Sequence, residues 1–297
     1  MRTIGVIGGS GLYEIEGLTA IERVAVETPF GAPSDEYLVG RLGSAKLVFL
    51  PRHGRGHKIA PNDINYRANI HGMKQLGVEW VISVSAVGSM RAEIRPGDIV
   101  IADQFFDRTK GRASTFFSDG VVGHVGFADP VCSALAGHLH GAAAEACAEK
   151  NRLSGGDARV HQGGTYVVIE GPQFSTRAES RIYRQWGVDV IGMTNLPEAK
   201  LAREAEMCYA TIALSTDYDC WHDTEEDVSV EAVLAIVRSN VTLAREIVRL
   251  AAERIPEGRD CHCPRAAEHA IMTDRAAIPA AARERLELLF GRYMGNS

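Results

Sequence analysis

The stretch Ile4-Gly5-Val6-Ile7 is a short apolar run that turns at once into Gly8-Gly9-Ser10-Gly11. Such a run, bounded by glycines, is typical of a buried strand. Further runs of this kind follow, and helical patterns lie between them. The expected strands are Ile4–Ile7, Lys46–Leu50, Trp80–Val84, Asp98–Ala102, Tyr166–Ile169, Asp189–Gly192 and Tyr209–Leu214. This alternation predicts an α/β fold with a mixed, mostly parallel central sheet flanked by helices.

Helical periodicity is clear in four segments of the chain. Apolar residues recur at helical spacing within 130–150 and 230–251, and again within 280–293. Thr176 and Glu179 form a capping-box pattern that starts a helix ending near Gly187. No linker, repeat or change of composition precedes residue 256. We therefore expect residues 1–255 to form one α/β domain and residues 256–297 to be a C-terminal helical extension that is not an independent domain.

Composition excludes several classes of protein. Of the 297 residues, 45% are apolar and 24% are charged, and the net charge is −6. General nucleic-acid binding usually needs clustered positive charge, so no nucleic-acid partner is expected. No apolar run is long enough to span a membrane, and the glycines after Ile7 come too early for a signal peptide. We expect a cytoplasmic protein without a membrane partner.

The chain has six cysteines. Cys132, Cys147 and Cys208 lie in apolar patterns, where a thiol behaves as a small hydrophobic group. Cys261 and Cys263 form a Cys-His-Cys triplet in a polar segment, which could bind a metal or oxidise. A zinc site needs four ligands and no second pair is evident, so a non-catalytic role is favoured and no metal site is expected. Whether the two form a disulfide stays open.

Small and polar residues follow the expected strands, where open α/β sheets bind ligands. Ser10, Arg52 and His53, Ser85 and Ala86, and Thr194 supply hydroxyls, free amides, an imidazole and a guanidinium. Each could be an ordinary turn or surface residue, but together they suit inorganic phosphate or a phosphate ester. No Gly-Lys-Ser/Thr motif follows a glycine-rich loop, which argues against a P-loop nucleotide triphosphatase.

Asp217 and Asp219 follow the last apolar strand. They could form a solvated turn. Alternatively, apolar surroundings and mutual repulsion could raise the pKa of Asp217, so that it protonates a leaving group near neutral pH.

Several ordered motifs together closely resemble the S-methyl-5′-thioadenosine phosphorylases, which are trimeric members of the purine nucleoside phosphorylase superfamily. The resemblance covers about residues 3–255. The motifs are Gly8-Gly9-Ser10-Gly11-Leu12, Thr28-Pro29-Phe30-Gly31, Arg52-His53-Gly54, Asn65-Tyr66-Arg67-Ala68-Asn69, Gly97-Asp98-Ile99-Val100, Glu170-Gly171-Pro172-Gln173-Phe174-Ser175, Gly192-Met193-Thr194 and Thr216-Asp217-Tyr218-Asp219-Cys220-Trp221.

The resemblance implies phosphorolysis of 5′-methylthioadenosine to adenine and 5-methylthioribose 1-phosphate, a step of methionine and purine salvage. It implies a homotrimer and a reaction with no metal or organic cofactor, in which inorganic phosphate is a co-substrate. The residues that would bind phosphate are Ser10, Arg52, His53, Ser85, Ala86 and Thr194. Those that would contact the nucleoside are Phe174, Ser175, Met193, Asp217, Tyr218, Asp219, Val230, Val233 and, from an adjacent subunit, His124.

Asp217 is the expected catalytic acid and also bears on specificity. A carboxylate can accept from the 6-amino group of adenine, whereas family members that prefer 6-oxopurines carry Asn at this place. Val230 and Val233 would form an apolar wall for the methylthio group. The alternatives are a purine nucleoside or methylthioinosine phosphorylase, a nicotinamide-dependent oxidoreductase that uses the N-terminal glycines, and a purine-binding protein without catalysis.

Overall fold

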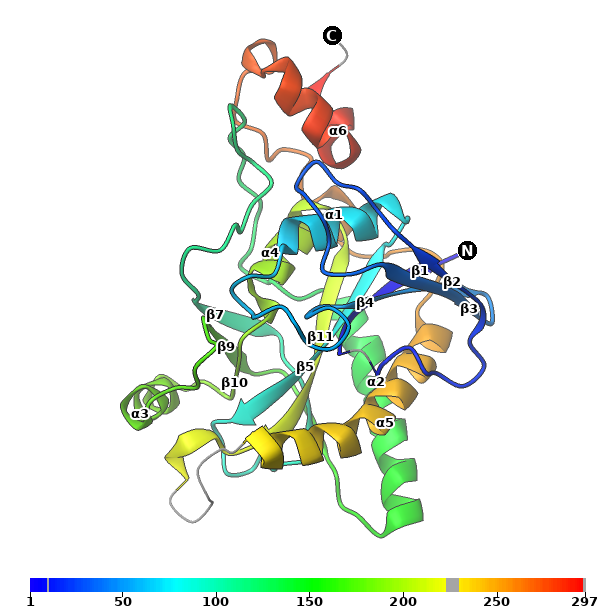
Figure 1. Cartoon of the computed structure of the whole chain (residues 1–297), viewed down its shortest axis with the longest axis vertical. Coiled ribbons are helices and arrows are strands. Elements are labelled where there is room, and N and C mark those ends of the chain that lie inside the picture. The colour runs from blue at the N-terminus through cyan, green and yellow to red at the C-terminus, as the bar shows by residue number, and fades with distance from the viewer. Residues whose placement is uncertain (10, 223–229, 296–297) are drawn as a thin grey trace.

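Within residues 1–9, 11–222 and 230–295, which a computed structural model describes, eleven strands form one mixed sheet (Figure 1). Of residues 230–239, only the backbone is described. The strands are β1 (Thr3–Gly8), β2 (Thr19–Val24), β3 (Tyr37–Leu42), β4 (Ala45–Pro51), β5 (Trp80–Ser89), β6 (Ile99–Ile101), β7 (Gln104–Arg108), β8 (Val160–Gln162), β9 (Thr165–Ile169), β10 (Val190–Gly192) and β11 (Cys208–Asp217).

The sheet is mostly parallel, as the sequence predicts. β1 pairs in parallel with β4 and β5, and β5 pairs in parallel with β11. The pairs β9–β10, β7–β9 and β6–β8 are also parallel, whereas β2–β3, β3–β4, β5–β10 and β6–β11 are antiparallel. All seven expected strands are confirmed. The sequence analysis missed β2, β3, β7 and β8. β2 and β7 are mostly exposed, so they carry no apolar run.

The helices are α1 (Tyr66–Gln75), α2 (Ser133–Ser154), α3 (Arg177–Gln185), α4 (Asn195–Glu204), α5 (Val230–Arg254) and α6 (Ala280–Met294), with short 3-10 turns at Asp219–Trp221, Cys263–Arg265 and Arg275–Ala277. α2, α3, α5 and α6 are the four predicted helices. The capping box is confirmed, because the Thr176 hydroxyl accepts from the Glu179 amide at 3.2 Å. α1 and α4 are the helices that the sequence patterns did not reveal. α4 contains Pro197, and Leu196 before it has non-helical backbone angles, which hides its periodicity.

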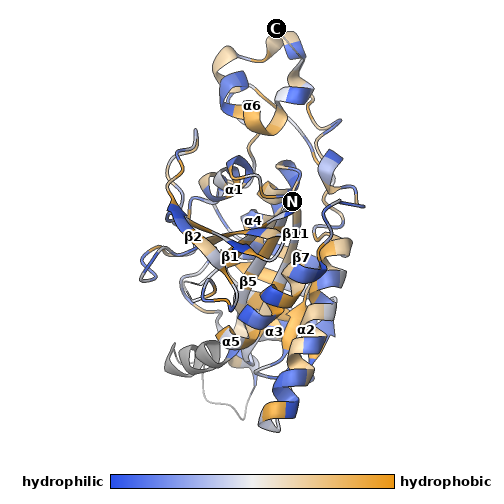
Figure 2. Cartoon of the chain, turned by 90° about the vertical axis from the view of Figure 1, so that its right-hand side faces the viewer, coloured by the Kyte–Doolittle hydropathy of each residue, from blue (hydrophilic) through white to orange (hydrophobic). Residues whose placement is uncertain are grey.

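Two apolar layers cover the two faces of the sheet. On one face α2 and α5 pack together through residues such as Leu139 and Val248 (Figure 2). On the other face α1 and α4 contribute Ile70 and Leu201. Alternate residues of β11 belong to the two layers, as the period of a strand requires. No helix in the described part of the chain is long and apolar enough to cross a membrane.

The C-terminal segment packs on the body of its own chain. α6 lies at one end of the molecule, beside the loop that contains Phe117 (Figure 1). The rings of Phe117 and Phe290 stack with their centroids 4.5 Å apart, and Leu286 and Leu289 are buried. The buried Glu206 accepts from the Tyr293 hydroxyl at 2.7 Å. The apolar side of α6 is therefore covered within the chain.

Candidate active site

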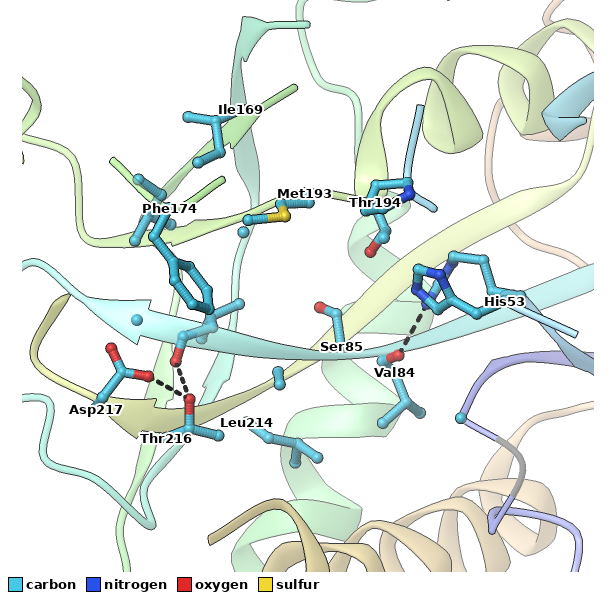
Figure 3. A pocket seen from close by; sticks show the side chains of 18 of the residues that line it. His53, Val84, Ser85, Ile169, Phe174, Met193, Thr194, Leu214, Thr216 and Asp217 are labelled. Carbon is cyan, nitrogen blue, oxygen red and sulfur yellow. Dashed lines mark hydrogen bonds between the residues drawn. The ribbon is translucent and has the colours of Figure 1, made fainter. Parts of the chain in front are cut away.

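A cavity of about 390 Å³ opens at the carboxyl ends of β1, β4, β5, β9, β10 and β11 (Figure 3). Parallel strands that end at one edge of a sheet bring residues distant in sequence into one place, which explains its position. Among the residues that the structure describes, ten predicted site residues line it. They are Arg52, His53, Ser85, Ala86, Phe174, Ser175, Met193, Thr194, Asp217 and Asp219.

The central wall of the cavity is formed by the ends of β5 and β11. The sequence predicts Ser85, Ala86 and Asp217 just beyond strand ends, and this part of the prediction is wrong. The two strands continue as a parallel pair that matches Ala213 with Ser85, and Asp217 is the last residue of β11. Small polar residues can stay in a strand where the ladder bonds satisfy the backbone. A register shift between Ser215 and Asp217 then marks a bulge, a feature that re-aims side chains.

The carboxyl groups of Asp217 and Asp219 lie in a largely buried part of the cavity. Burial raises the pKa of Asp217, although hydrogen bonds from the Thr216 hydroxyl and the Asp219 amide oppose that shift. Burial also raises the pKa of Asp219, to which the charge of Asp217 adds. Gly88 faces the pair, and a Cβ there would lie 2.9 Å from Asp217 Oδ1. The protein thus holds two carboxyl groups where a neutral acid is favoured.

Thr216 is a site residue that the resemblance did not assign. Its hydroxyl lies 2.6 Å from Asp217 Oδ2 and 3.1 Å from the Val87 carbonyl oxygen (Figure 3). A hydroxyl has one proton, so it can donate to only one of these oxygens at a time. When it donates to Val87, Asp217 Oδ2 must itself carry a proton to keep the 2.6 Å contact as a hydrogen bond. The hydroxyl can therefore pair with either protonation state of Asp217, and when it donates to the carboxylate it lowers the pKa of that group.

His53 is a neutral imidazole at the other end of the cavity. Burial and the charge of Arg52 lower the pKa of His53 to about 4. Its Nδ1 lies 2.8 Å from the Ile59 carbonyl, which can only accept, so Nδ1 carries the proton. Nε2 is therefore left as an acceptor. The ring also stacks on His57, with centroids 4.3 Å apart.

Arg52 lines the cavity, but its guanidinium is engaged below the surface. Nε and Nη2 donate to the two carboxylate oxygens of Glu198, at 2.8 and 3.0 Å, and both side chains are almost fully buried. Nη2 also donates to the Ser83 hydroxyl at 2.6 Å. Nη1 makes a longer bond, of 3.3 Å, to the Val84 carbonyl. The planar fork that the sequence suggests for phosphate is thus occupied by Glu198, and Arg52 can offer an anion its charge and Nη1.

Between these ends the lining is apolar with a few polar atoms. The side chain of Met193 lies between the Asp217 end and the Ser85, Thr194 and His53 end (Figure 3). Phe174 is 51% exposed and forms part of the rim beside Asp217. In the described part of the chain, the buried Ser175 hydroxyl has no hydrogen-bond partner. It is a polar atom that a ligand can satisfy.

Among the described residues, Tyr218 and His124 are predicted site residues that do not line this cavity. The Tyr218 hydroxyl donates to the Ala92 carbonyl at 3.3 Å. His124 is exposed, and its amide donates to the Ala270 carbonyl of the C-terminal segment at 2.9 Å. Ser10 and the side chains of Val230 and Val233 lie outside the described residues.

Comparison with known proteins identifies the family. Residues 3–253 match the model of the phosphorylase superfamily. An S-methyl-5′-thioadenosine phosphorylase of Geobacter sulfurreducens is 60% identical over 294 residues, which cover 99% of each chain. The crystal structure of a methylthioadenosine phosphorylase from an antarctic soil metagenomic library is 46% identical and has a TM-score of 0.90, with 97% of this chain and 98% of that chain covered.

A more distant structure has a ligand. A mutant adenosine/methylthioadenosine phosphorylase of Schistosoma mansoni, in complex with methylthioadenosine, is 37% identical with a TM-score of 0.75, and covers 86% of this chain and 91% of that one. The chain therefore belongs to the phosphorylase superfamily and, within it, to the family of S-methyl-5′-thioadenosine phosphorylases.

Proposed function

We propose that this chain uses inorganic phosphate to cleave the glycosidic bond of S-methyl-5′-thioadenosine, giving adenine and 5-methylthioribose 1-phosphate. The observation that carries the proposal is the polarity of the cavity. Asp217, a half-buried carboxyl group with a raised pKa, lies at one end, and hydroxyls, an amide and an imidazole lie at the other. A purine needs a proton donor as it leaves, and phosphate needs hydrogen-bonding groups.

At the phosphate end, the Ser85 and Thr194 hydroxyls and the Ala86 amide would bind phosphate oxygens, together with Ser10. His53 Nε2, an acceptor in the neutral ring, would accept the proton of a monohydrogen phosphate. Arg52, which is engaged below the surface of the cavity, would contribute its positive charge and a hydrogen bond from Nη1. These groups hold the nucleophile beside C1′, which supplies much of the advantage of an intramolecular reaction.

At the base end, Asp217 would donate a proton to N7 as the bond to C1′ breaks. The purine gains negative charge and the ribose gains oxocarbenium character in the transition state, so the acid stabilises the first and the phosphate anion the second. Asp219 would accept from the 6-amino group of adenine. Ser175 and Phe174 would lie against the base, and Met193 under the ribose.

The 5′ end of the substrate would meet an apolar wall. Leu12 and Val241 line the described part of the cavity, and Val230 and Val233 belong to the same helix as Val241. A buried hydroxyl without a partner costs free energy, so the methylthio group is favoured over the 5′-hydroxyl of adenosine. An apolar pocket rejects a hydroxyl only moderately, by about a hundredfold.

The remaining features of the proposal come from the family. The enzyme would act in the cytoplasm as a homotrimer, with methionine and purine salvage as its role. The reaction would need no metal or organic cofactor. His124 of an adjacent subunit would complete the site, which agrees with its exposed position away from the cavity of its own chain. Light scattering on the eluted peak of a size-exclusion column tests the trimer.

The decisive experiment is release of free base in phosphate buffer. Methylthioadenosine, adenosine, methylthioinosine and inosine are compared, with a phosphate-free control for each. We expect phosphate-dependent adenine release with methylthioadenosine as the best substrate. A preference for inosine-type substrates would contradict the role of Asp217 in specificity, and no release from any substrate would support a binding protein instead.

A further inference from the structure

Four cysteines from distant parts of the chain meet at the end of the sheet opposite the cavity. Their sulfur atoms all lie within 4.8 Å of one another. Cys132 precedes α2 and Cys208 is the first residue of β11, whereas Cys261 and Cys263 belong to the C-terminal segment. Cys132, Cys208 and Cys263 are buried and Cys261 is half-buried. Cys132 and Cys208 thus supply the second pair of ligands that the sequence around Cys261 and Cys263 lacks.

The distances between the sulfur atoms fit a tetrahedral metal site. Zinc–thiolate bonds of about 2.3 Å place any two ligating sulfurs about 3.8 Å apart. Cys208 Sγ and Cys261 Sγ are 3.4 Å apart, and the other pairs all lie within 4.8 Å, an upper limit that leaves room for the tetrahedral value. A disulfide requires about 2.05 Å. The four sulfurs therefore form one compact cluster and are not arranged as two bonded pairs.

The backbone holds these cysteines in place independently of any metal. The Cys132 amide donates to the Tyr209 carbonyl at 2.8 Å, and the Cys208 amide donates to the Glu79 carbonyl at 2.9 Å. The Cys263 carbonyl accepts from the Ala266 amide at 3.2 Å. Two ligands are thereby fixed on the body and one in the turn that begins at Cys263. A preorganised set of donors lowers the entropy cost of metal binding.

The donor set selects the kind of ion. Four sulfurs are soft ligands that suit zinc, whereas calcium and magnesium need oxygen. His262, between Cys261 and Cys263, is exposed, and among the described residues the cluster contains cysteines alone. Four protein ligands leave no open position, which is the pattern of a structural site. The ten residues of β11, nine steps of about 3.3 Å each, place Cys208 about 30 Å from Asp217.

We propose that Cys132, Cys208, Cys261 and Cys263 bind one Zn²⁺ ion in a tetrahedral structural site that fastens the C-terminal segment to the body. On binding, the four thiols lose four protons and form four zinc–sulfur bonds, with no change of oxidation state. The ion would cross-link residues that lie on three separate stretches of the chain. It would stabilise the fold without taking part in the reaction.

The test is metal analysis of the full-length protein, purified under reducing conditions and then incubated with Zn²⁺ and freed of excess ion. We expect one zinc per chain by mass spectrometry of the metal. Loading with Co²⁺ should give the visible absorption of a tetrahedral cobalt–thiolate site. Alkylation in denaturant should find six free thiols, since the ion leaves on unfolding. No bound zinc with six free thiols would overturn the proposal, and so would fewer thiols, which would indicate a disulfide.

The matched variants are Cys261→Ser and Cys147→Ser. Cys261 is the most exposed of the four, so its replacement is the least disruptive to folding, and Cys147 is a buried cysteine outside the cluster. Cys261→Ser should lose the cobalt–thiolate absorption, and a strong zinc chelator should then no longer lower its midpoint of thermal unfolding. Cys147→Ser should keep both responses of the wild type. Equal zinc content and chelator response in the Cys261→Ser and wild-type proteins would contradict the proposed ligand set.

Discussion

The two ends of β11 show how one strand can serve two purposes. At its amino end, Cys208 is fully buried and its amide bonds to the neighbouring Glu79. At its carboxyl end, the register shifts after Ser215 and Asp217 lines the cavity. The first end gathers cysteines that fix the chain, and the second presents a carboxyl group to a ligand. Cys208 thus lies where the pairing of β11 is regular. Asp217, to which we assign the chemistry, lies where the register shifts.

This difference separates stability from activity along one element. Polar side chains that line the cavity at the carboxyl end should alter catalysis with less loss of stability, because they face the space that a ligand would fill. Residues at the amino end, and those between, should alter stability first. Variants on or beside the two ends of β11 test this separation, and a variant on α1 serves as a reference for the pH dependence of stability.

Asp217→Asn should have the largest effect. The amide cannot donate a proton to N7 as an acid, so kcat/KM for methylthioadenosine should fall by about 10²–10⁴-fold, and 6-oxopurine nucleosides should become relatively better substrates. The midpoint of thermal unfolding should not fall, because burial already disfavours the charged carboxylate that the substitution removes. Initial rates of base release and a thermal melt measure the two quantities.

The control for this variant is Asp157→Asn, a change of the same kind at an exposed position. It should leave kcat/KM and the substrate preference unchanged. If Asp217→Asn releases adenine at the rate of the wild type, the assignment of the catalytic acid is wrong.

Glu198→Gln should have the largest effect on stability. Glu198 accepts from Arg52 under the cavity and from the Tyr209 hydroxyl, at 2.9 Å, on the amino half of β11. Removing one charge of a buried ion pair leaves the other uncompensated, which typically costs about 3–5 kcal/mol. The amide keeps some hydrogen bonds, so we expect about 3 kcal/mol, measured by urea unfolding. Glu149→Gln removes an exposed partner of Arg152 and should not move the unfolding midpoint. Equal midpoints in the two variants would mean that the buried pair contributes nothing.

Most of the fold follows from the sequence, since apolar runs of four to six residues indicate buried strands wherever helices cover both faces. The candidate phosphate-binding and purine-binding residues could be identified because they follow the apolar runs of the expected strands or match the motifs of the family. Thr216 and Glu198 could not be identified in this way. Their roles depend on contacts that only the folded chain makes, between Thr216 and Asp217 and between Glu198 and Arg52. The cysteine cluster was hidden for a related reason. Its members lie up to 131 residues apart in the chain (263 − 132), and only the packing of α2, β11 and the C-terminal segment brings them together.

Thr216→Val should lower kcat/KM less than Asp217→Asn does, and it should also shift the pH dependence of kcat/KM. The hydroxyl bond to Asp217 lowers the pKa of that carboxyl group, so its loss should raise the pKa further. In the proposed mechanism Asp217 acts in the protonated form, and a higher pKa keeps it protonated to higher pH. The basic limb of kcat/KM should therefore move upward, with about a tenfold loss at the optimum from poorer positioning. Thr216→Ser restores the hydroxyl and should return the limb to its wild-type position. Superimposable pH profiles for the Val variant and the wild type would exclude this role.

His71→Leu should have the smallest effect, and it separates the pH dependence of stability from that of catalysis. His71 lies on α1, away from both ends of β11, and in the described part of the chain neither of its buried ring nitrogens has a partner. Burial lowers its pKa from 6.5 to about 4. The unfolded chain therefore takes up a proton near pH 6.5, whereas the folded chain does so only near pH 4, and stability falls as the pH drops through this range. His71→Leu should be more stable than the wild type by about 1–3 kcal/mol at pH 4 and should show a flatter decline below pH 6.5, whereas His269→Gln, at an exposed position, should follow the wild type. Because the variant leaves the carboxyl end of β11 intact, its pH profile of kcat/KM should keep the limbs of the wild type. A profile that moved together with the pH dependence of stability would show that unfolding, and not Asp217, sets the pH dependence of kcat/KM.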